Sequence, residues 1–263
     1  MKLKLHHINA FTDTLFKGNY AGVIFLDEWL STKLMQVIAT ENNVSETAFV
    51  KQDGEDTYHI RWFSPITEID FCGHATLASA YVLFKQDQAL NEVEFYAKAV
   101  GTLKARRETD GFIAMSFPKQ TPEPASEIPE ALLAGLSIAP SEVLINRQAY
   151  FAIYTNEADI HLLKPNLTEL KKLAPYDVVI SAAAHDYDFI SRYFWPASGG
   201  DEDPVTGSIH SGLAPFWANR LNKTQLVAYQ ASMRGGILHC QVQTDAVIIS
   251  GQAVQYLEGD IEI

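Results

Sequence analysis

Two stretches of the sequence combine acidic residues, glycine and a small polar residue or histidine directly before an apolar segment. One stretch, 69–74, leads into the apolar segment 75–84, and the other, 199–208, leads into the apolar segment 209–217. A helix start of this kind aims backbone N–H groups at one point, where the helix dipole adds positive charge. Both stretches therefore predict an anion-binding site at a helix N-terminus.

The glycines of these stretches, Gly73 and Gly207, lie about half of the 263 residues apart, as a duplicated domain would place them. Removing a proton beside a carboxylate builds negative charge on its oxygens, and preorganised N–H donors stabilise that charge. We expect Gly73, Gly207 and Ser208 to bind the anionic group of a small-molecule substrate. We also expect the two helix starts to face each other across one site.

The composition excludes several other classes of protein. A hydrophobic content of 47% with 20% charged residues is typical of a globular protein. The net charge of −12 argues against a nucleic-acid partner, whose phosphates must be neutralised by lysine and arginine. The first residues carry no signal-peptide pattern, and no apolar run approaches the ~18 residues that span a bilayer. We expect a cytoplasmic protein with no membrane partner.

Hydrophobic periodicity and turn residues predict a mixed α+β protein with two similar halves. The proline-rich segment 118–129 is typical of a linker, so we expect an N-terminal domain 1–117 and a C-terminal domain 118–263. The last strand is a candidate to return to the N-terminal domain. Helices are expected at 75–84, at 130–136, at 208–221 and after Ser31 as an N-cap, and strands at 2–7, 21–26, 46–50, 58–63, 93–96, 103–106, 112–117, 149–154, 178–181, 189–194, 226–229, 237–243, 247–249 and 254–263.

Three motifs, 61–65, 68–76 and 202–210, closely resemble the PhzF-like (phenazine biosynthesis-like) family of the diaminopimelate epimerase-like superfamily. The segment 18–21 also resembles the N-terminal signature of that family, with Tyr20 in place of a usual proline. The resemblance covers essentially the whole chain. It implies two similar epimerase-like domains, each a curved mixed β-sheet or barrel around a central helix, with the active site in the cleft between them. It also implies a homodimer.

The resemblance further implies a proton shift, an isomerisation that needs no cofactor and no metal. Glu46 stands at the position of the family's acid/base glutamate, and a single such group can take and return a proton. His74 and Asp203 match residues that assist proton handling and orientation. Ser208 matches a residue that helps to hold the substrate carboxylate or amine.

Racemases of this superfamily instead use two cysteines that act from opposite faces of the substrate. Here Cys72 stands at the first cysteine position, but the second position is judged to be Thr206, which is no usable base near neutral pH. We therefore expect no two-thiol racemase, and we interpret Cys72 as structural or pocket-lining. The other cysteine, Cys240, is expected to be a small buried hydrophobic residue. Two cysteines imply no disulfide framework, and a reducing compartment fits.

Alternatives remain open at this stage. One is a catalytically silent binding or scaffold protein of the same fold, in which Glu46, His74 and Asp203 only cap helices or form turns. Another is a hydrolase that uses Ser208, His210 and Asp203, although His210 follows Ser208 by two positions and so points to another side of the helix. No metal site is expected, because the histidines His6, His7 and His210 lack partners at metal-ligand spacing.

Overall fold

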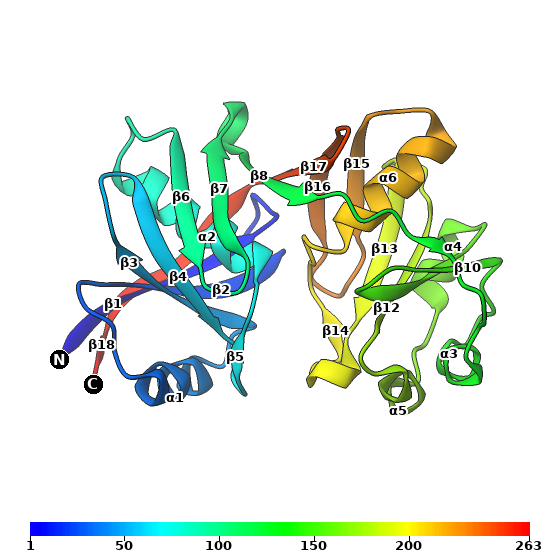
Figure 1. Ribbon diagram of the computed structural model, residues 1–263, viewed down its shortest axis with the longest axis horizontal. Coiled ribbons are helices and arrows are strands. Elements are labelled where there is room, and N and C mark those ends of the chain that lie inside the picture. The colour runs from blue at the N-terminus through cyan, green and yellow to red at the C-terminus, as the bar shows by residue number, and fades with distance from the viewer. The chain divides into compact units, whose positions relative to one another are not determined.

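The computed structural model describes the backbone of all 263 residues and every side chain except that of Ser198. Its contacts divide the chain into two compact units (Figure 1). Unit 1 comprises Met1–Ser116 together with Ser250–Ile263, and unit 2 comprises Phe117–Ile249. That the chain forms two separate domains with a boundary at 117/118, as we expect from the sequence, stays a prediction.

A mixed β-sheet forms most of unit 1. Strand β2 pairs antiparallel with β1 and parallel with β3, β3 pairs antiparallel with β4, β4 pairs parallel with β6, and β6 pairs antiparallel with β7. The C-terminal strand β18 pairs antiparallel with β1, so the two chain ends lie side by side in this sheet (Figure 1). The strands of unit 1 are β1 Lys2–Ala10, β2 Asn19–Leu26, β3 Glu46–Gln52, β4 Thr57–Phe63, β5 Glu68–Ile69, β6 Glu92–Ala97, β7 Gly101–Arg107, the start of β8 Ile113–Pro118 and β18 Ala253–Glu262.

Helix α2, Gly73–Gln86, is the central helix of unit 1 and contacts β1, β2, β3, β7 and β18. Its side chains are buried on nearly every side, which its uniformly apolar sequence predicts. Helix α1, Thr32–Asn42, begins where the sequence predicts, because the Ser31 hydroxyl accepts a hydrogen bond from the Leu34 N–H at 3.2 Å. The helix ends at Asn43, which takes the left-handed conformation that asparagine tolerates.

Unit 2 repeats the strand pairing of unit 1. Strand β11 pairs parallel with β12, β12 antiparallel with β13, β13 parallel with β15, and β15 antiparallel with β16. This is the pairing order of β2, β3, β4, β6 and β7 in unit 1. The strands are β9 Glu123–Pro124, β10 Glu142–Ile145, β11 Ala149–Ile153, β12 Asp177–Ala183, β13 Phe189–Phe194, β14 Glu202–Asp203, β15 Gln225–Gln230, β16 Gly236–Val242 and β17 Ala246–Gly251, of which the last two residues belong to unit 1.

The central helix of unit 2 is α6, His210–Leu221, which contacts β15 and β16. It begins two residues later than predicted, because Gly207 and Ser208 form a tight turn in which the His210 and Ser211 N–H groups donate to their carbonyls, both at 3.1 Å. Pro215 lies inside this helix. Shorter helices, α3 Glu130–Gly135, α4 Glu157–Leu162 and α5 Leu167–Leu170, supply side chains to a buried apolar cluster of the unit.

Each unit therefore places one buried helix against a mixed sheet, and this is the predicted α+β fold with two similar halves. Among the described residues, no helix is both long enough and apolar enough to cross a membrane.

We expect the substitution Gly212→Ala to destabilise unit 2. A Cβ at this position of α6 would lie 2.7 Å from the Phe151 ring and 3.0 Å from the Gln120 carbonyl oxygen, neither of which has room to move in a packed core. Overpacking outweighs the roughly 1 kcal/mol that alanine gains over glycine inside a helix, so we expect a net loss of about 1–2 kcal/mol. Urea unfolding followed by tryptophan fluorescence measures this loss.

The matched control is Gly259→Ala in β18, where the nearest atom would be a Leu257 methyl group at 3.8 Å. We expect this variant to stay within about 0.5 kcal/mol of the wild type. Equal stability of the two variants would contradict the close packing of α6.

Candidate active site

The predicted acid/base glutamate lies at the start of strand β3, beside the start of the neighbouring strand β2. Ala21 of β2 is paired with Glu46 of β3, so Asn19, the first residue of β2, lies near the Glu46 end of the pair. The segment Cys72–Gly73–His74 forms the start of α2, which packs on both strands. The parallel pairing and the central helix together bring Gly73 to one place in unit 1 with four side chains, those of Asn19, Glu46, Cys72 and His74.

The cluster is held by short contacts between buried side chains. His74 Nε2 lies 3.0 Å from Glu46 Oε2, and the other ring nitrogen, Nδ1, lies 3.1 Å from the side-chain nitrogen of Asn19. Glu46 and His74 are each only 6% exposed. An imidazole that donates from Nε2 to the carboxylate can accept at Nδ1 from the Asn19 amide, so the three groups form one consistent hydrogen-bonded chain.

Cys72 belongs to the same cluster. Its Sγ lies 3.7 Å from Glu46 Oε2 and 3.5 Å from His74 Nδ1, and the residue is 5% exposed. It occupies the N-cap position of α2 without a side-chain capping bond, so its thiol is directed to the glutamate and histidine instead. The prediction that Cys72 is structural or lines a pocket does not include these contacts, although its position two residues before His74 is a signal for them.

Gly73 is the first residue of α2 and is buried. The Thr76 N–H donates to the Cys72 carbonyl at 3.2 Å and closes the first turn, so the amides of Gly73 and Ala75 point out of the helix start. The local geometry is therefore the one expected for an anion site at a helix N-terminus, next to a carboxylate and an imidazole that can exchange a proton.

The other predicted residues lie in unit 2, where Asp203 is held by its own loop. The Thr206 hydroxyl donates to Asp203 Oδ2, and the Gln230 side chain donates to the Asp203 carbonyl at 2.8 Å. The Thr206 N–H in turn donates to Gln230 Oε1 at 2.9 Å. Gln230, fully buried on β15, thus fixes the loop that carries Asp203. Sequence reasoning missed this glutamine, because nothing in its local pattern marks it.

Ser208 ends a second polar chain in unit 2. The Gln148 amide donates to Ser208 Oγ at 2.9 Å and to the Tyr193 hydroxyl at 3.0 Å. Tyr193 donates in turn to Asp177 Oδ2 at 2.5 Å. Burial raises the pKa of Asp177 to about 6, although the Tyr193 hydrogen bond favours its charged form. The predicted ligand residue Ser208 is therefore oriented by three side chains that the sequence did not single out.

His210 has a structural role in the first turn of α6. The residue is fully buried, and burial lowers its pKa to about 4, so the ring is neutral near pH 7. Its Nδ1 donates to the Thr206 carbonyl at 2.8 Å, and the ring stacks on Phe189. Because Nδ1 is bonded to that carbonyl and Ser208 Oγ is bonded to Gln148, these contacts argue against the hydrolase alternative.

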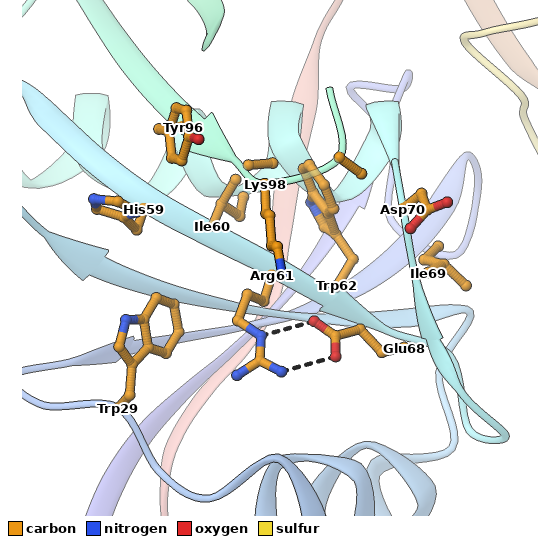
Figure 2. A pocket seen from close by; sticks show the side chains of 12 residues that line it. Trp29, His59, Ile60, Arg61, Trp62, Glu68, Ile69, Asp70, Tyr96 and Lys98 are labelled. Atoms are coloured by element: carbon orange, nitrogen blue, oxygen red, sulfur yellow. Dashed lines mark hydrogen bonds and ion pairs between the residues drawn. The ribbon is translucent and has the colours of Figure 1, made fainter. Parts of the chain in front are cut away.

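A separate pocket of about 680 Å³ opens on the sheet of unit 1 (Figure 2). Arg61 of β4 forms a two-pronged ion pair with Glu68 of β5 at its edge, with both N–O distances 2.7 Å. Trp29 and Lys98 flank that pair in Figure 2, and Asp70 lines the pocket two residues before Cys72. Glu46, Cys72 and His74 are not among the residues that line this pocket.

The model of one protein family, described as phenazine biosynthesis-like protein, matches residues 8–259 of the chain. The chain belongs to this family. A protein of Pseudomonas aeruginosa named as an uncharacterized isomerase is 45% identical over the whole of both chains. The human phenazine biosynthesis-like domain-containing protein is 33% identical over 99% of both.

Solved structures agree with this assignment. The crystal structure of a phenazine biosynthesis protein of the PhzF family from Enterococcus faecalis superimposes over the whole of both chains with a TM-score of 0.95 and 38% identity. A hydroxyproline epimerase from Agrobacterium vitis covers 99% of this chain and 92% of its own, with a TM-score of 0.63 and 10% identity, which shows the shared fold alone. With curated relatives named isomerases, this member of the phenazine biosynthesis-like family is an isomerase.

We expect the substitution Asp177→Asn to change how the stability of the protein depends on pH. Because the pKa of Asp177 is about 6 in the folded protein and 3.8 in its ordinary state, the folded chain binds more protons between these values. The wild type therefore loses stability from this group as the pH rises from about 4 to above 6. Relative to the wild type, the variant should gain up to roughly 3 kcal/mol over that interval, because one pKa unit is worth about 1.4 kcal/mol.

Urea unfolding of both proteins at several pH values between 4 and 7.5 measures the difference in their free energies of unfolding. The contributions of groups that titrate equally in both proteins cancel in this difference. Asparagine keeps a carbonyl that accepts from Tyr193, so its other effects are constant with pH. A stability difference that does not change with pH would contradict a raised pKa at Asp177.

Proposed function

We propose that this isomerase moves a proton on a small carboxylate-bearing metabolite without a cofactor, and that Glu46 is its general acid/base. The observation that carries the proposal is the contact of 3.0 Å between the buried Glu46 carboxylate and His74 Nε2. A carboxylate and an imidazole in contact share one proton readily, and burial keeps bulk water from competing for it. Such a pair can take a proton from carbon and return it to another position.

His74 is proposed to assist this proton transfer, and Asn19 to orient His74. The Asn19 contact with Nδ1 fixes the ring so that its other nitrogen, Nε2, meets Glu46. When Glu46 takes up a proton, its hydrogen bond with the His74 ring can rearrange without a large movement of either group. Cys72, which touches both, is proposed to shape the same small volume.

The anionic group of the substrate is proposed to bind at the two helix starts, that of α2 with Gly73 and that of α6 with Gly207 and Ser208. Donors held at the carboxylate oxygens stabilise the charge that builds there when the neighbouring carbon loses its proton. The Ser208 hydroxyl is supported for this role by the amide of Gln148, and Asp203 by Thr206 and Gln230. Asp203 is proposed to assist proton handling and orientation.

The scaffold alternative has less support. Burying a carboxylate costs several kcal/mol unless it is paired and hydrogen-bonded, and a protein without turnover has no need of such a group beside the start of its central helix. Relatives named isomerases also favour the enzyme. We further propose that the enzyme acts as a homodimer, as the family resemblance implies, and that it is cytoplasmic, for which the two free thiols Cys72 and Cys240 give support.

We expect the substitution Glu46→Gln to abolish proton exchange on carbon. A panel of small 2-amino, 2-hydroxy and unsaturated carboxylic acids is incubated with the protein in deuterium oxide, and mass spectrometry measures deuterium incorporated at carbon. The wild type should label at least one acid, and the variant should label it at least about 100-fold more slowly, because a positioned acid/base group contributes about 10²–10⁴-fold. Binding of that acid, measured by calorimetry, should change little.

The control is Glu28→Gln, an exposed glutamate that forms a surface ion pair with Lys51 at 2.7 Å. Its exchange rate should match the wild type. If Glu46→Gln exchanges as fast as the wild type, Glu46 is not the base, and if no acid of the panel is labelled by the wild type, the proposed substrate class is wrong.

A further inference from the structure

The buried cluster of unit 1 contains an oxygen, a sulfur and a nitrogen ligand within 4.8 Å of one another. Glu46 Oε2 lies 3.0 Å from His74 Nε2 and 3.7 Å from Cys72 Sγ, and the sulfur lies 3.8 Å from His74 Nε2. In a tetrahedral zinc site, metal–ligand distances of about 2.0–2.3 Å place neighbouring ligand atoms about 3.3–3.8 Å apart. The three edges of this triangle each lie within about half an ångström of that range.

We propose that Glu46, Cys72 and His74 form a binding site for a thiophilic divalent transition-metal ion of the zinc class, and that the bound ion inhibits the enzyme. A thiolate and an imidazole select such ions over Mg²⁺ and Ca²⁺, which prefer oxygen ligands. Three protein ligands leave a fourth tetrahedral position for water.

Charge favours the ion in this buried place. The Glu46 carboxylate and the Cys72 thiolate carry two negative charges, which balance the two positive charges of the ion. When the S–metal bond forms, the thiol proton of Cys72 leaves for solvent, so binding releases about one proton per ion. The three residues keep 5–6% of their surface exposed, so an ion reaches them with small side-chain movements.

Asn19 supports the histidine from behind. When Nε2 binds a metal ion, Nδ1 carries the ring hydrogen and needs an acceptor, and the Asn19 side chain lies 3.1 Å from it. Rotating that amide presents its oxygen to the ring, which is the outer contact that metal-bound histidines usually make. Asn19 itself is fully buried, so its position is fixed by packing.

Inhibition follows from the overlap of the two roles. The ion would occupy Glu46 Oε2 and His74 Nε2, the atoms that are proposed to exchange the proton. This consequence rests on the proposed function, whereas the binding of the ion does not.

Titration of the full-length protein with Co²⁺, a spectroscopic substitute for zinc, tests the site without any substrate. We expect one ion per chain, a thiolate-to-cobalt charge-transfer band and visible absorption typical of tetrahedral cobalt, and displacement of both by Zn²⁺. Cys72→Ser should lose the charge-transfer band. His74→Gln should keep the band but bind at least about 100-fold more weakly, because changes to outer contacts alone cost about 10–100-fold. Asn19→Ala should weaken binding within that smaller range.

Two controls separate this site from adventitious binding. Cys240→Ala removes the other thiol, which is buried in β16 with a raised pKa, and should leave the band unchanged. His185→Gln removes an exposed histidine beside Asp186 and should leave the affinity unchanged. The unfolding midpoints of Cys72→Ser and His74→Gln are compared with that of the wild type to show that both variants are folded. The proposed site is overturned if the wild type shows no charge-transfer band. It is also overturned if the folded Cys72→Ser variant keeps the band.

The deuterium exchange assay then separates the two proposals. Zn²⁺ at saturation should reduce exchange by the wild type at least about 100-fold, and a chelator should restore it. If the ion binds with the expected spectrum but exchange continues, the inhibition is wrong and the site stands. If no exchange is seen even without metal, the proposed function fails while the spectrum still decides the metal site.

Discussion

The contact between the Glu46 carboxylate and the His74 imidazole sets the strongest constraint on unit 1. Both groups are buried, and a buried carboxylate is costly unless a partner and further hydrogen bonds compensate it. The structure meets this demand with three elements far apart in the sequence, namely the starts of β2, β3 and α2. Asn19 stabilises the far side of the imidazole, and the packed apolar helix keeps His74 at its place. The central position of α2 therefore serves the site as well as the core.

The two units use one arrangement of strands for different chemistry. In both, parallel and antiparallel pairs alternate in the same order around one buried helix. In unit 1 the start of α2 carries the thiol and the imidazole, and the start of β3 carries the carboxylate. The corresponding loop of unit 2 carries hydroxyl and amide groups, with Gln230 and Gln148 holding Asp203 and Ser208 in defined orientations. A repeated scaffold thus brings a carboxylate, a thiol and an imidazole together in unit 1 and a different set of polar groups in unit 2.

Local features of the sequence were predictable because their causes are local. The Ser31 cap, the buried helix α2 and most strands follow from side-chain type and spacing within about ten residues. The polar chain through Gln148, Tyr193 and Asp177 was not predictable, because its members lie on two strands and in the turn before a third, 16 to 45 positions apart. The two-residue strands β5 and β14 were also missed, because two residues carry no periodicity. The contact of Cys72 with Glu46 depends on how α2 packs against β3, which cannot be read from the pattern of a single sequence.

The two histidines at the central helices show why a pattern alone does not determine chemistry. His74 and His210 each stand in the first turn of a buried helix after a glycine-containing stretch. His210 is surrounded by Phe189 and a backbone carbonyl, so burial lowers its pKa to about 4 and the ring stays neutral. His74 instead has its Nε2 3.0 Å from the Glu46 carboxylate and its Nδ1 3.1 Å from the Asn19 side chain. The position of one glutamate on a neighbouring strand therefore gives the two histidines different surroundings.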